Sequence, residues 1–447
     1  MNRESMLLTD LYQLSMLQGY FDQGMNEMAV FEFFVRKMPA QRNFLIAAGL
    51  EQVLEYLEAA RFLPDELDWL KRCGRFRGDF VESLINWRFT GDVDAMPEGT
   101  VFFPDEPVLR VVAPMREAQL VETRIINLLQ FQCMVASKAV RSVFAADGRM
   151  LVDFGLRRAH GAEAGLLSAR ASFIAGFTGT ATVLAGMRWE IPLFGTMAHS
   201  YIEAHARESE AFENFTRAHP AGSTLLIDTY DTEEAARRLV SLLPQMAAKG
   251  VSVGSVRIDS GDLAEHAKQV RQILDSGGLR EIKIFASGNL DENRIHALLA
   301  SGAPIDGFGV GTKMNTSADQ PYLDCAYKLQ EYAGTPRRKR SEGKATWPGR
   351  KQVFRSFDAD GKMAGDRLAL HDEPATGRTL LQPTMRQGKR LSASPPLARI
   401  RTRLREELAT LPAPLHALDP VTPAYPVQVS DAVQRLALLA DSLSRQR

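Results

Sequence analysis

The sequence predicts an α/β protein with an irregular (β/α) barrel beside a mixed α/β domain that is built from both chain ends. From about residue 150, strand-like apolar runs alternate with helical periodicity roughly every 25–30 residues, which is typical of βα units and a parallel sheet. Polar residues fall at the C-terminal ends of these strands, where the active sites of βα barrels lie. The chain has 447 residues, more than one hydrophobic core usually serves.

The predicted barrel occupies residues 121–350. Its strand-like runs are MLVDFG, STLLID, SVGSVRID, EIKIFASGN and APIDGFGVG, and helical segments follow near SARASFIAGF, EEAARRLVSLLPQMAAKG, LAEHAKQVRQILDSGG and DENRIHALLASGA. An open doubly wound sheet would also place ligands at strand C-termini, so it remains the alternative fold. Helix capping explains Asp291 and Thr232 at these ends, but it does not explain the pair Arg157 and Arg158.

The segments 1–120 and 351–447 flank the barrel. In the first, TDLYQLSMLQGYF and GLEQVLEYLEAA predict helices, and MAVFEFFVR predicts a strand. In the second, strand-like runs are followed by RIRTRLREELATL and the Pro-rich LPAPLHALDPVTPAYP, and we expect this segment to pack with the N-terminal domain and the barrel. The basic, turn-rich GTPRRKRSEGKATWPGRK predicts a surface loop near the junction.

Composition excludes several classes of protein. Lys plus Arg and Asp plus Glu both total 54, so no net charge favours nucleic acid or an anionic membrane as a partner. Cys73, Cys133 and Cys325 are far apart and lack metal-site spacing, which suits a reducing compartment. The N-terminus is too polar for a signal peptide, and no apolar run is long enough to span a bilayer. We therefore expect a cytoplasmic protein without nucleic-acid or membrane partners.

The glycine-rich stretch IDGFGVGTKM follows the last predicted strand of the barrel. Gly307, Gly309 and Gly311 alternate there, so bare backbone N–H groups can approach a phosphate. A plain turn is an equal alternative. The stretch lacks GK[ST], so a nucleoside-triphosphate P-loop is not expected.

Two further strand ends carry charged side chains. In VRIDSGD, Arg257, Asp259 and Asp262 stand close together, where carboxylates suit Mg²⁺ or ribose hydroxyls and a guanidinium suits a carboxylate or phosphate. The alternative is a structural ion pair. In DFGLRR, the aromatic face of Phe154 precedes two arginines, of which one is expected to be structural. An aromatic face beside a cation suits a planar, anionic ring.

The stretch FGTMAHSYIEAH contains His199, Glu203 and His205. No H-E-x-x-H pattern is present, and His205 points away from the face that the other two share on a helix, so a zinc site is not expected. His205 is expected to be an ordinary helical residue. His199 directly follows a strand end and is expected to face the mouth of the barrel.

Eight motifs in order resemble the nicotinate phosphoribosyltransferase family over nearly the whole chain. They are TDLYQLSM, FEFFVRKMP, DFGLRR, GTMAHSY, LLIDTYDT, VRIDSGD, FGVGTK and AYKLQEYAGTPRRKRS…GKATWPGRK. The resemblance implies the irregular barrel of the nicotinate/quinolinate phosphoribosyltransferase type, and a homodimer that shares its active sites across the interface. It implies the joining of nicotinate to phosphoribosyl pyrophosphate, with Mg²⁺ as cofactor and ATP as co-substrate. The products would be nicotinate mononucleotide, pyrophosphate, ADP and phosphate, as in an ATP-dependent ligase of NAD salvage.

The resemblance also implies roles for individual residues. His199 matches the transiently phosphorylated histidine, and Phe154 and Tyr12 match the aromatic residues that enclose the pyridine ring, with Tyr12 supplied by the partner subunit. Arg257 matches the arginine that binds the ring carboxylate, and Asp259 matches a ribose- or magnesium-associated carboxylate. The remaining implied substrate-binding residues are Asp10, Arg157, Thr180, Ala181, Ser260, Gly288, Gly309, Gly311 and Thr312.

The residue at position 181 bears on substrate choice. The relative that uses nicotinamide carries an aspartate where this sequence has Ala181, so the alanine favours an acidic ring. Lys313 occupies a loop position that often holds a small residue, and its role, like those of Lys339 and Lys344, is left open. The alternatives are a nicotinamide- or quinolinate-using transferase, a nucleotide-sensing barrel without activity, and a metal-dependent barrel hydrolase.

Overall fold

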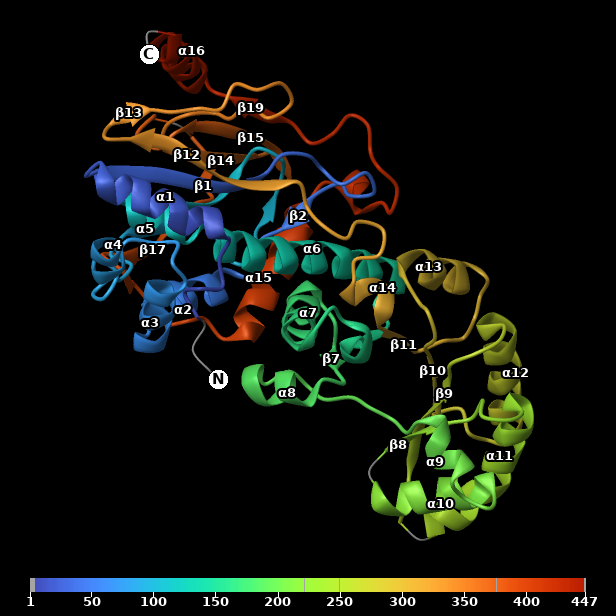
Figure 1. The fold of residues 1–447 in the computed structure, drawn as a ribbon. Helices are drawn as coiled ribbons and strands as arrows, with labels where there is room; N and C mark the ends of the chain where they lie inside the picture. The colour runs from blue at the N-terminus through green and yellow to red at the C-terminus, as the bar shows by residue number, and fades with distance from the viewer. Residues whose placement is uncertain (1–4, 221, 249, 375, 446–447) are drawn as a thin grey trace. The chain divides into compact units, whose positions relative to one another are not determined.

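The computed structural model describes residues 5–220, 222–248, 250–374 and 376–445. The chain divides into two compact units, each described by itself below. Unit 1 comprises residues 1–134 and 322–447, and unit 2 comprises residues 135–321 (Figure 1). Within the described residues, no helix is both long enough and apolar enough to cross a membrane.

Unit 1 is built on mainly antiparallel sheets to which both chain ends contribute, with one parallel pair between β15 and β19. Its seven-stranded sheet has the order β13-β12-β1-β5-β3-β17-β18, beside a four-stranded sheet β16-β14-β15-β19 and a two-stranded sheet β2-β4. The strands are β1 (Met28–Val35), β2 (Leu45–Ile46), β3 (Asp92–Ala95), β4 (Val101–Phe102), β5 (Pro107–Pro114), β12 (Cys325–Tyr332), β13 (Thr335–Pro336), β14 (Lys351–Phe357), β15 (Met363–Leu370), β16 (Arg378–Thr379), β17 (Gln382–Arg386), β18 (Lys389–Arg390) and β19 (Val427–Val429).

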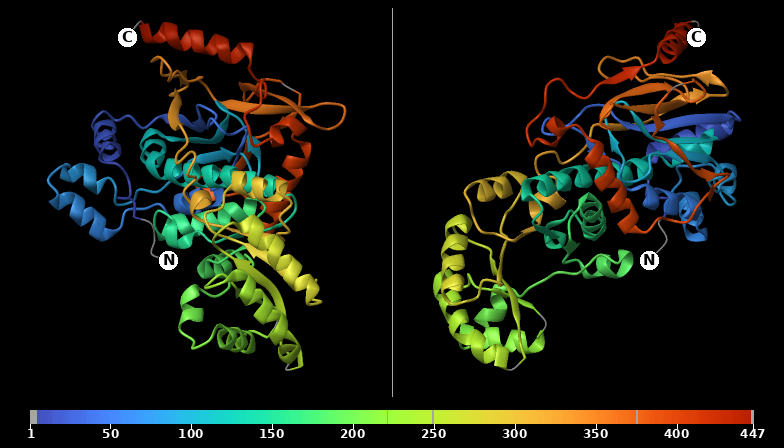
Figure 2. Two further views of the ribbon diagram at one scale, coloured as in Figure 1. Left: turned by 90° about the vertical axis from the view of Figure 1, so that its right-hand side faces the viewer. Right: turned by 180° about the vertical axis from the view of Figure 1, so that it is seen from behind.

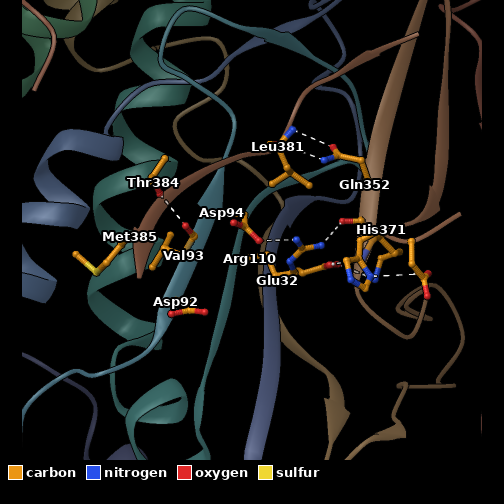
Figure 3. Close-up of polar contacts among 12 residues, drawn as sticks. Glu32, Asp92, Val93, Asp94, Arg110, Gln352, His371, Leu381, Thr384 and Met385 are labelled. Atoms are coloured by element: carbon orange, nitrogen blue, oxygen red, sulfur yellow. Dashed lines mark hydrogen bonds and ion pairs between the residues drawn. The ribbon is translucent and has the colours of Figure 1, made fainter. Parts of the chain in front are cut away.

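The centre of the large sheet joins segments that are distant in the sequence. β1 pairs with β12 and with β5, and seven of its eight residues are buried, which explains why MAVFEFFV is nearly all apolar. Figure 3 shows Arg110 of β5 directed at Asp94 of β3, an ion pair with 2.5 Å between Nη2 and Oδ2. In the same view the Gln352 side chain bonds the backbone of Leu381 in both directions. Arg110 also donates from Nη1 to the Lys351 carbonyl oxygen at 2.6 Å, which ties the C-terminal strand β14 to the N-terminal strand β5.

Helices accompany the sheets of unit 1. α5 contacts β1 and β5, and α1 contacts α5, so these helices cover one face of the large sheet (Figure 1). The helices are α1 (Leu11–Asp22), α2 (Leu50–Ala59), α3 (Pro64–Arg72), α4 (Gly78–Glu82), α5 (Met115–Leu120), α15 (Leu397–Thr410), η2 (Ala413–His416) and α16 (Asp431–Arg445). A further helix, α6 (Glu122–Ala146), begins in unit 1, and its residues from 135 onward belong to unit 2. The predicted helices at the positions of α1 and α2 are confirmed, whereas the long α6 and the C-terminal α15 and α16 were not predicted.

Unit 2 contains a six-stranded parallel sheet with the order β7-β6-β11-β10-β9-β8. The strands are β6 (Met150–Asp153), β7 (Gly179–Thr180), β8 (Ser223–Leu226), β9 (Val253–Ile258), β10 (Lys283–Ala286) and β11 (Gly307–Val310). The five predicted strands are present, and the predicted α/β class is confirmed. No pairing between the described residues joins β7 to β8, so the sheet observed is a parallel half-barrel, and full closure stays a prediction.

Helices alternate with these strands, as expected for βα units. They are η1 (Leu156–Arg158), α7 (Ala162–Ala175), α8 (Val183–Trp189), α9 (His199–Glu203), α10 (Glu208–Ala218), α11 (Thr232–Ala248), α12 (Leu263–Ser276), α13 (Glu292–Ala300) and α14 (Thr312–Asn315). α12 packs on β9 and β10, and α11 packs on α12, so both lie along one face of the sheet (Figure 2). Because all six strands are parallel, their C-terminal ends meet at one edge.

Candidate active site

A pocket of about 360 Å³ opens at the C-terminal ends of β6, β9, β10 and β11. Nine of the predicted site residues line it: Phe154, Arg157, Arg257, Asp259, Ser260, Gly288, Gly309, Gly311 and Thr312. These residues come from four separate loops that the parallel sheet brings together. The lining also contains Arg158, Gly261, Leu263, Ser287, Asn289 and Arg294.

Arg257 is the centre of the polar cluster in this pocket. Its guanidinium carbon lies 5.4 Å from the centre of the Phe154 ring. Its Nε donates to Ser287 Oγ at 2.7 Å, and its Nη1 donates to Thr196 Oγ1 at 2.9 Å. Its Nη2 lies 2.7 Å from Asp259 Oδ1 in an ion pair. Three polar partners and an aromatic face therefore hold this cation in one orientation.

Asp259 carries the negative charge of the cluster. Burial alone would raise the pKa of Asp259, but hydrogen bonds from Ser287 and Arg257, with the charges of Arg257 and His199, lower it below the ordinary value. The carboxylate is therefore ionised at neutral pH. The hydrogen bonds from Arg257 and Ser287 both reach Oδ1, at 2.7 and 2.5 Å, and Oδ2 accepts none among the described contacts.

Asp228, two residues after β8, holds the loop after β9. Its Oδ2 accepts a hydrogen bond from the Asp259 backbone N–H at 2.9 Å and from the Ser260 hydroxyl at 2.6 Å. Its Oδ1 is shielded from solvent and has no hydrogen-bond partner among the described residues. The sequence marked this strand end as polar but did not single out Asp228.

Three glycines of the pocket have neighbouring atoms so close to the backbone that a larger residue would clash. A Cβ at Gly309 would lie 2.5 Å from the Phe154 ring, so the ring rests on the glycine backbone. A Cβ at Gly311 would lie 2.9 Å from the Phe154 carbonyl oxygen. Gly288 has a φ of +96° and faces the Asp259 carbonyl oxygen, 2.0 Å from where a Cβ would stand. The alternation GFGVG therefore clears space for an aromatic ring.

His199 begins the short helix α9 at the same edge of the sheet. Its Nδ1 lies 3.2 Å from Thr229 Oγ1, and its charge contributes to the lowered pKa of Asp259. It does not line the pocket as outlined above. Within the described ranges no group of three or more His, Cys, Asp or Glu side chains is placed so that it could hold a metal ion.

Thr180 and Ala181 lie at the end of β7 and not in the pocket lining. The Thr180 hydroxyl is buried and donates to Asp153 Oδ2 at 2.8 Å, while the Ala181 backbone N–H donates to the Asp153 carbonyl oxygen at 2.9 Å. The Ala181 side chain is exposed. Thr180 is thus occupied by an internal hydrogen bond.

Tyr12 and Asp10 belong to unit 1. Tyr12 lies in the first turn of α1 and is 48% exposed. Burial of part of the ring, with the nearby charges of Glu122 and Asp10, raises the pKa of the Tyr12 phenol, which is therefore neutral. Asp10 Oδ2 accepts a hydrogen bond from the Thr123 hydroxyl at 3.0 Å.

Helix capping accounts for more of the polar strand ends than we predicted. Asp262 was placed with Arg257 and Asp259, but its carboxylate accepts from the backbone N–H groups of residues 264 and 265 and caps α12. Asp291 caps α13, as predicted. Thr232 was wrongly taken as a cap, because Asp231 accepts from the backbone of residue 234 and Thr232 is the first residue of α11.

The three lysines that the sequence left open have different surroundings. The Lys313 ammonium lies 2.6 Å from Asp291 Oδ2, so it joins α14 to the start of α13. Lys339 and Lys344 have exposed side chains in the basic loop of unit 1.

Three polar residues of the pocket were missed. Ser287 and Asn289 flank Gly288 at the end of β10, where the polar triplet SGN was visible in the sequence. Arg294 reaches the pocket from the first turn of α13, and no spacing or motif in the sequence indicated this.

Comparisons with known proteins agree with this architecture. The nicotinate phosphoribosyltransferase (NAPRTase) N-terminal domain matches residues 7–130, and the nicotinate phosphoribosyltransferase (NAPRTase) family matches residues 150–339. Nicotinate phosphoribosyltransferase pncB2 of Mycobacterium tuberculosis is 48% identical over 96% of this chain and 92% of its own length. The enzyme named nicotinate phosphoribosyltransferase of Bacillus subtilis is 38% identical over 84% of this chain and 78% of its own.

A solved structure matches the whole fold. The crystal structure of human nicotinic acid phosphoribosyltransferase aligns with a TM-score of 0.85 at 27% identity, over 98% of this chain and all of that one. The structure of nicotinate-nucleotide pyrophosphorylase from Pyrococcus furiosus aligns with a TM-score of 0.74 at 25% identity, over 91% and 95%. Sequence and structure lead to one conclusion: this chain belongs to the nicotinate phosphoribosyltransferase family.

Proposed function

We propose that this protein transfers the phosphoribosyl group of phosphoribosyl pyrophosphate to nicotinate, giving nicotinate mononucleotide and pyrophosphate. The observation that carries this is the contact between Phe154 and Arg257, with 5.4 Å between the guanidinium carbon and the ring centre. An aromatic face beside a fixed cation suits a planar ring with a carboxylate. Family membership supports the same reaction.

Arg257 can still bind a substrate carboxylate although it is already engaged. A guanidinium has five N–H donors. Arg257 donates three hydrogen bonds, to Ser287, Thr196 and Asp259. A further contact to the Met197 carbonyl oxygen is long at 3.5 Å. At least one donor remains for a ligand in the pocket.

The phosphates of the sugar substrate have a cationic and glycine-lined pocket available. Arg157, Arg158 and Arg294 line it, and Gly288 and Gly311 leave backbone N–H groups open to an oxyanion. In the reaction the C1–O bond to pyrophosphate breaks as the C1–N bond to the ring forms, and positive charge develops on the ribose. The arginines stabilise the departing pyrophosphate, and the stacked ring is held in line with C1.

Mg²⁺ is the proposed cofactor. Mg²⁺ commonly binds through substrate phosphates and one or two protein carboxylates. Asp259 suits this, because it is ionised and its Oδ2 accepts no hydrogen bond among the described contacts. When bound, the ion would neutralise charge on the pyrophosphate.

We further propose that His199 is phosphorylated by ATP and that the active enzyme is a cytoplasmic homodimer. His199 lies at the same strand edge as the pocket and affects Asp259 electrostatically, so a phosphate there would alter affinities within the pocket. Tyr12 has an exposed ring and would supply the second aromatic face from the partner subunit. We also propose that the six-stranded half-barrel of unit 2 is part of a complete irregular barrel.

A turnover assay tests the proposal. Purified protein is incubated with phosphoribosyl pyrophosphate, Mg²⁺ and nicotinate, nicotinamide or quinolinate, each with and without ATP. We expect nicotinate mononucleotide from nicotinate, stimulated by ATP. Preferential use of nicotinamide or quinolinate, or no product from any ring, would contradict the proposal.

A further inference from the structure

Asp153, the last residue of β6, is fully buried and lies directly before Phe154. Its Oδ1 accepts hydrogen bonds from the Gly155 backbone N–H at 2.9 Å and from Asn315 Nδ2 at 2.8 Å. Its Oδ2 accepts from the Thr180 hydroxyl at 2.8 Å. One side chain therefore gathers three donors from three different segments of unit 2.

Each of these segments carries part of the candidate active site. Gly155 follows Phe154, and its N–H bond to Asp153 sets the backbone immediately after the ring. Asn315 ends α14, which begins at Thr312 beside the pocket, and its backbone N–H donates to the Gly311 carbonyl oxygen at 3.0 Å. Asp153 is thus bonded to Gly155, which follows the aromatic residue, and to Asn315, which is bonded to the glycine loop.

The packing around Asn315 is equally specific. A Cβ at position 155 would lie 1.7 Å from Asn315 Nδ2, so the amide sits directly on the glycine backbone. The amide Oδ1 is buried and accepts no hydrogen bond among the described residues. A buried amide with an unused oxygen is costly, and its position is therefore explained by the bonds of its nitrogen to Asp153 and Gly311.

The charge on Asp153 has no cationic partner within the described part of the chain, since its contacts there are an amide, a hydroxyl and a backbone N–H. Burial raises its pKa, and the bonds from Asn315, Thr180 and Gly155 oppose this. Buried groups of this kind are expensive unless all their bonds are made. An apolar residue at position 153 would stabilise the fold as well as the carboxylate does, so we favour a positioning role for Asp153.

We propose that Asp153 and Asn315 together are positioning residues that hold the ring-stacking face of Phe154 and the glycine loop 309–312 in mutual register. This inference rests on the proposed function, and it deepens it by assigning two residues that touch no substrate. Binding of the ring and binding of the sugar phosphate then depend on one buried hydrogen-bond network. Support of this kind sets how well a site is preorganised.

The test compares substitutions that differ in hydrogen-bond capacity. Asp153→Ala removes both acceptor oxygens and with them all three hydrogen bonds. Asp153→Asn keeps an acceptor oxygen for Gly155 and Asn315, and its new N–H group can donate to the Thr180 hydroxyl. Asn315→Ala removes the link to the glycine loop. Ser172→Ala is the matched control, because Ser172 is buried in α7 of the same unit and its hydroxyl bonds only the Ala169 carbonyl oxygen among the described contacts.

Steady-state kinetics give the first readout. We expect Asp153→Ala and Asn315→Ala each to raise the KM for both nicotinate and phosphoribosyl pyrophosphate by about tenfold or more. The KM values of the double variant should be no higher than those of the more strongly affected single variant, because both residues act through one network. Asp153→Asn should restore both KM values to within about threefold of wild type, and Ser172→Ala should change neither. Wild-type KM values in folded Asp153→Ala, or equal damage from Asp153→Asn and Asp153→Ala, would overturn the proposal.

Hydrogen–deuterium exchange gives a readout that does not depend on turnover. Without any substrate, Asn315→Ala should speed exchange in the segments 154–158 and 309–316 relative to both wild type and Ser172→Ala. Unchanged exchange there would overturn the inference even if the reaction is as proposed. Conversely, faster exchange in a protein that makes no nicotinate mononucleotide would refute the proposed function and leave the network established. If Asp153→Ala does not fold, Asn315→Ala and Asp153→Asn still decide the question.

Discussion

The Arg257 guanidinium is packed against the Phe154 ring at 5.4 Å and joined to Asp259 at 2.7 Å, so a single arginine links the aromatic and acidic sides of the pocket. Arg257→Lys keeps the charge but loses the planar fork that reaches Ser287 and Asp259 at once. We expect the KM for nicotinate to rise about ten- to a hundredfold, in steady-state assays. Arg271→Lys is the control, because Arg271 ties α12 to nearby carbonyl oxygens away from the pocket. Equal effects of the two substitutions would contradict this assignment.

The close approach of Gly309 to Phe154 makes a second prediction. Gly309→Ala places a methyl group 2.5 Å from the ring position seen here, so the ring must move. We expect the KM for nicotinate to rise about tenfold, since small misplacements in a site are costly. Gly19→Ala, where a Cβ meets no atom within 4 Å, should leave the KM unchanged. A wild-type KM in Gly309→Ala would show that the ring position does not matter.

His199 and His205 form a matched pair for testing ATP coupling. We expect His199→Ala to retain some phosphoribosyl transfer and to lose its stimulation by ATP, because the imidazole is the proposed phosphate acceptor. Among the described contacts the His205 ring makes one hydrogen bond, which Nδ1 donates to the Tyr201 carbonyl oxygen, so His205→Ala should keep the stimulation. Rates with and without ATP decide this. Equal stimulation of wild type and His199→Ala would rule out the assignment.

Asp259 predicts a pH dependence with a definite sign. Its pKa in the folded protein lies below the ordinary value of 3.8, because the bonds from Ser287 and Arg257 outweigh burial. A carboxylate whose pKa is lowered by folding stabilises the folded protein at pH values above its ordinary pKa. That contribution is lost as the pH falls through the lowered pKa of the folded protein. Thermal unfolding should therefore show wild type more stable than Asp259→Asn at neutral pH, with the difference shrinking below pH 4 or so. A difference that is constant down to pH 2 or so would contradict this reasoning.

Lys313 distinguishes a structural lysine from a phosphate contact. Its ammonium lies 2.6 Å from Asp291 Oδ2, and the Lys313 side chain is 35% exposed, so the pair is partly screened. We expect Lys313→Met to lower the free energy of unfolding by about 0.5–1 kcal/mol and to leave the KM for phosphoribosyl pyrophosphate within about threefold of wild type. Chemical denaturation and kinetics measure both. A tenfold or larger rise in that KM would instead identify a phosphate-binding role.

The sequence predicted unit 2 well because its periodicity changes clearly between strand and helix. Five of its strands and the helices after them lie where the apolar runs indicated. The short strand β7 and the helix α6 were missed, since a two-residue strand has no period and α6 mixes polar and apolar residues over 25 positions. The pairing of β1 with β12 could not be predicted, because contacts across roughly 300 residues leave no local signal.

For the pocket, residues in recognisable motifs were found and residues that act through tertiary contacts were not. Phe154 and Arg257 stand in strand-end motifs, whereas Arg294 and Asp228 reach their positions through folding alone. Asp262 was misassigned for the opposite reason, since a carboxylate at a strand end is also the start of a helix. Capping and ligand binding use the same residue types, and only coordinates separate them.

The continuous bonding around Arg257 has a practical meaning for anyone who wishes to redesign substrate preference. Three neighbours of that arginine, Phe154, Thr196 and Ser287, belong to other segments of unit 2, so an exchange there would disturb several segments at once. Ala181 differs, because its side chain projects outward and only its backbone is used. Variation at the rim of β7 is therefore the less disruptive starting point for a library.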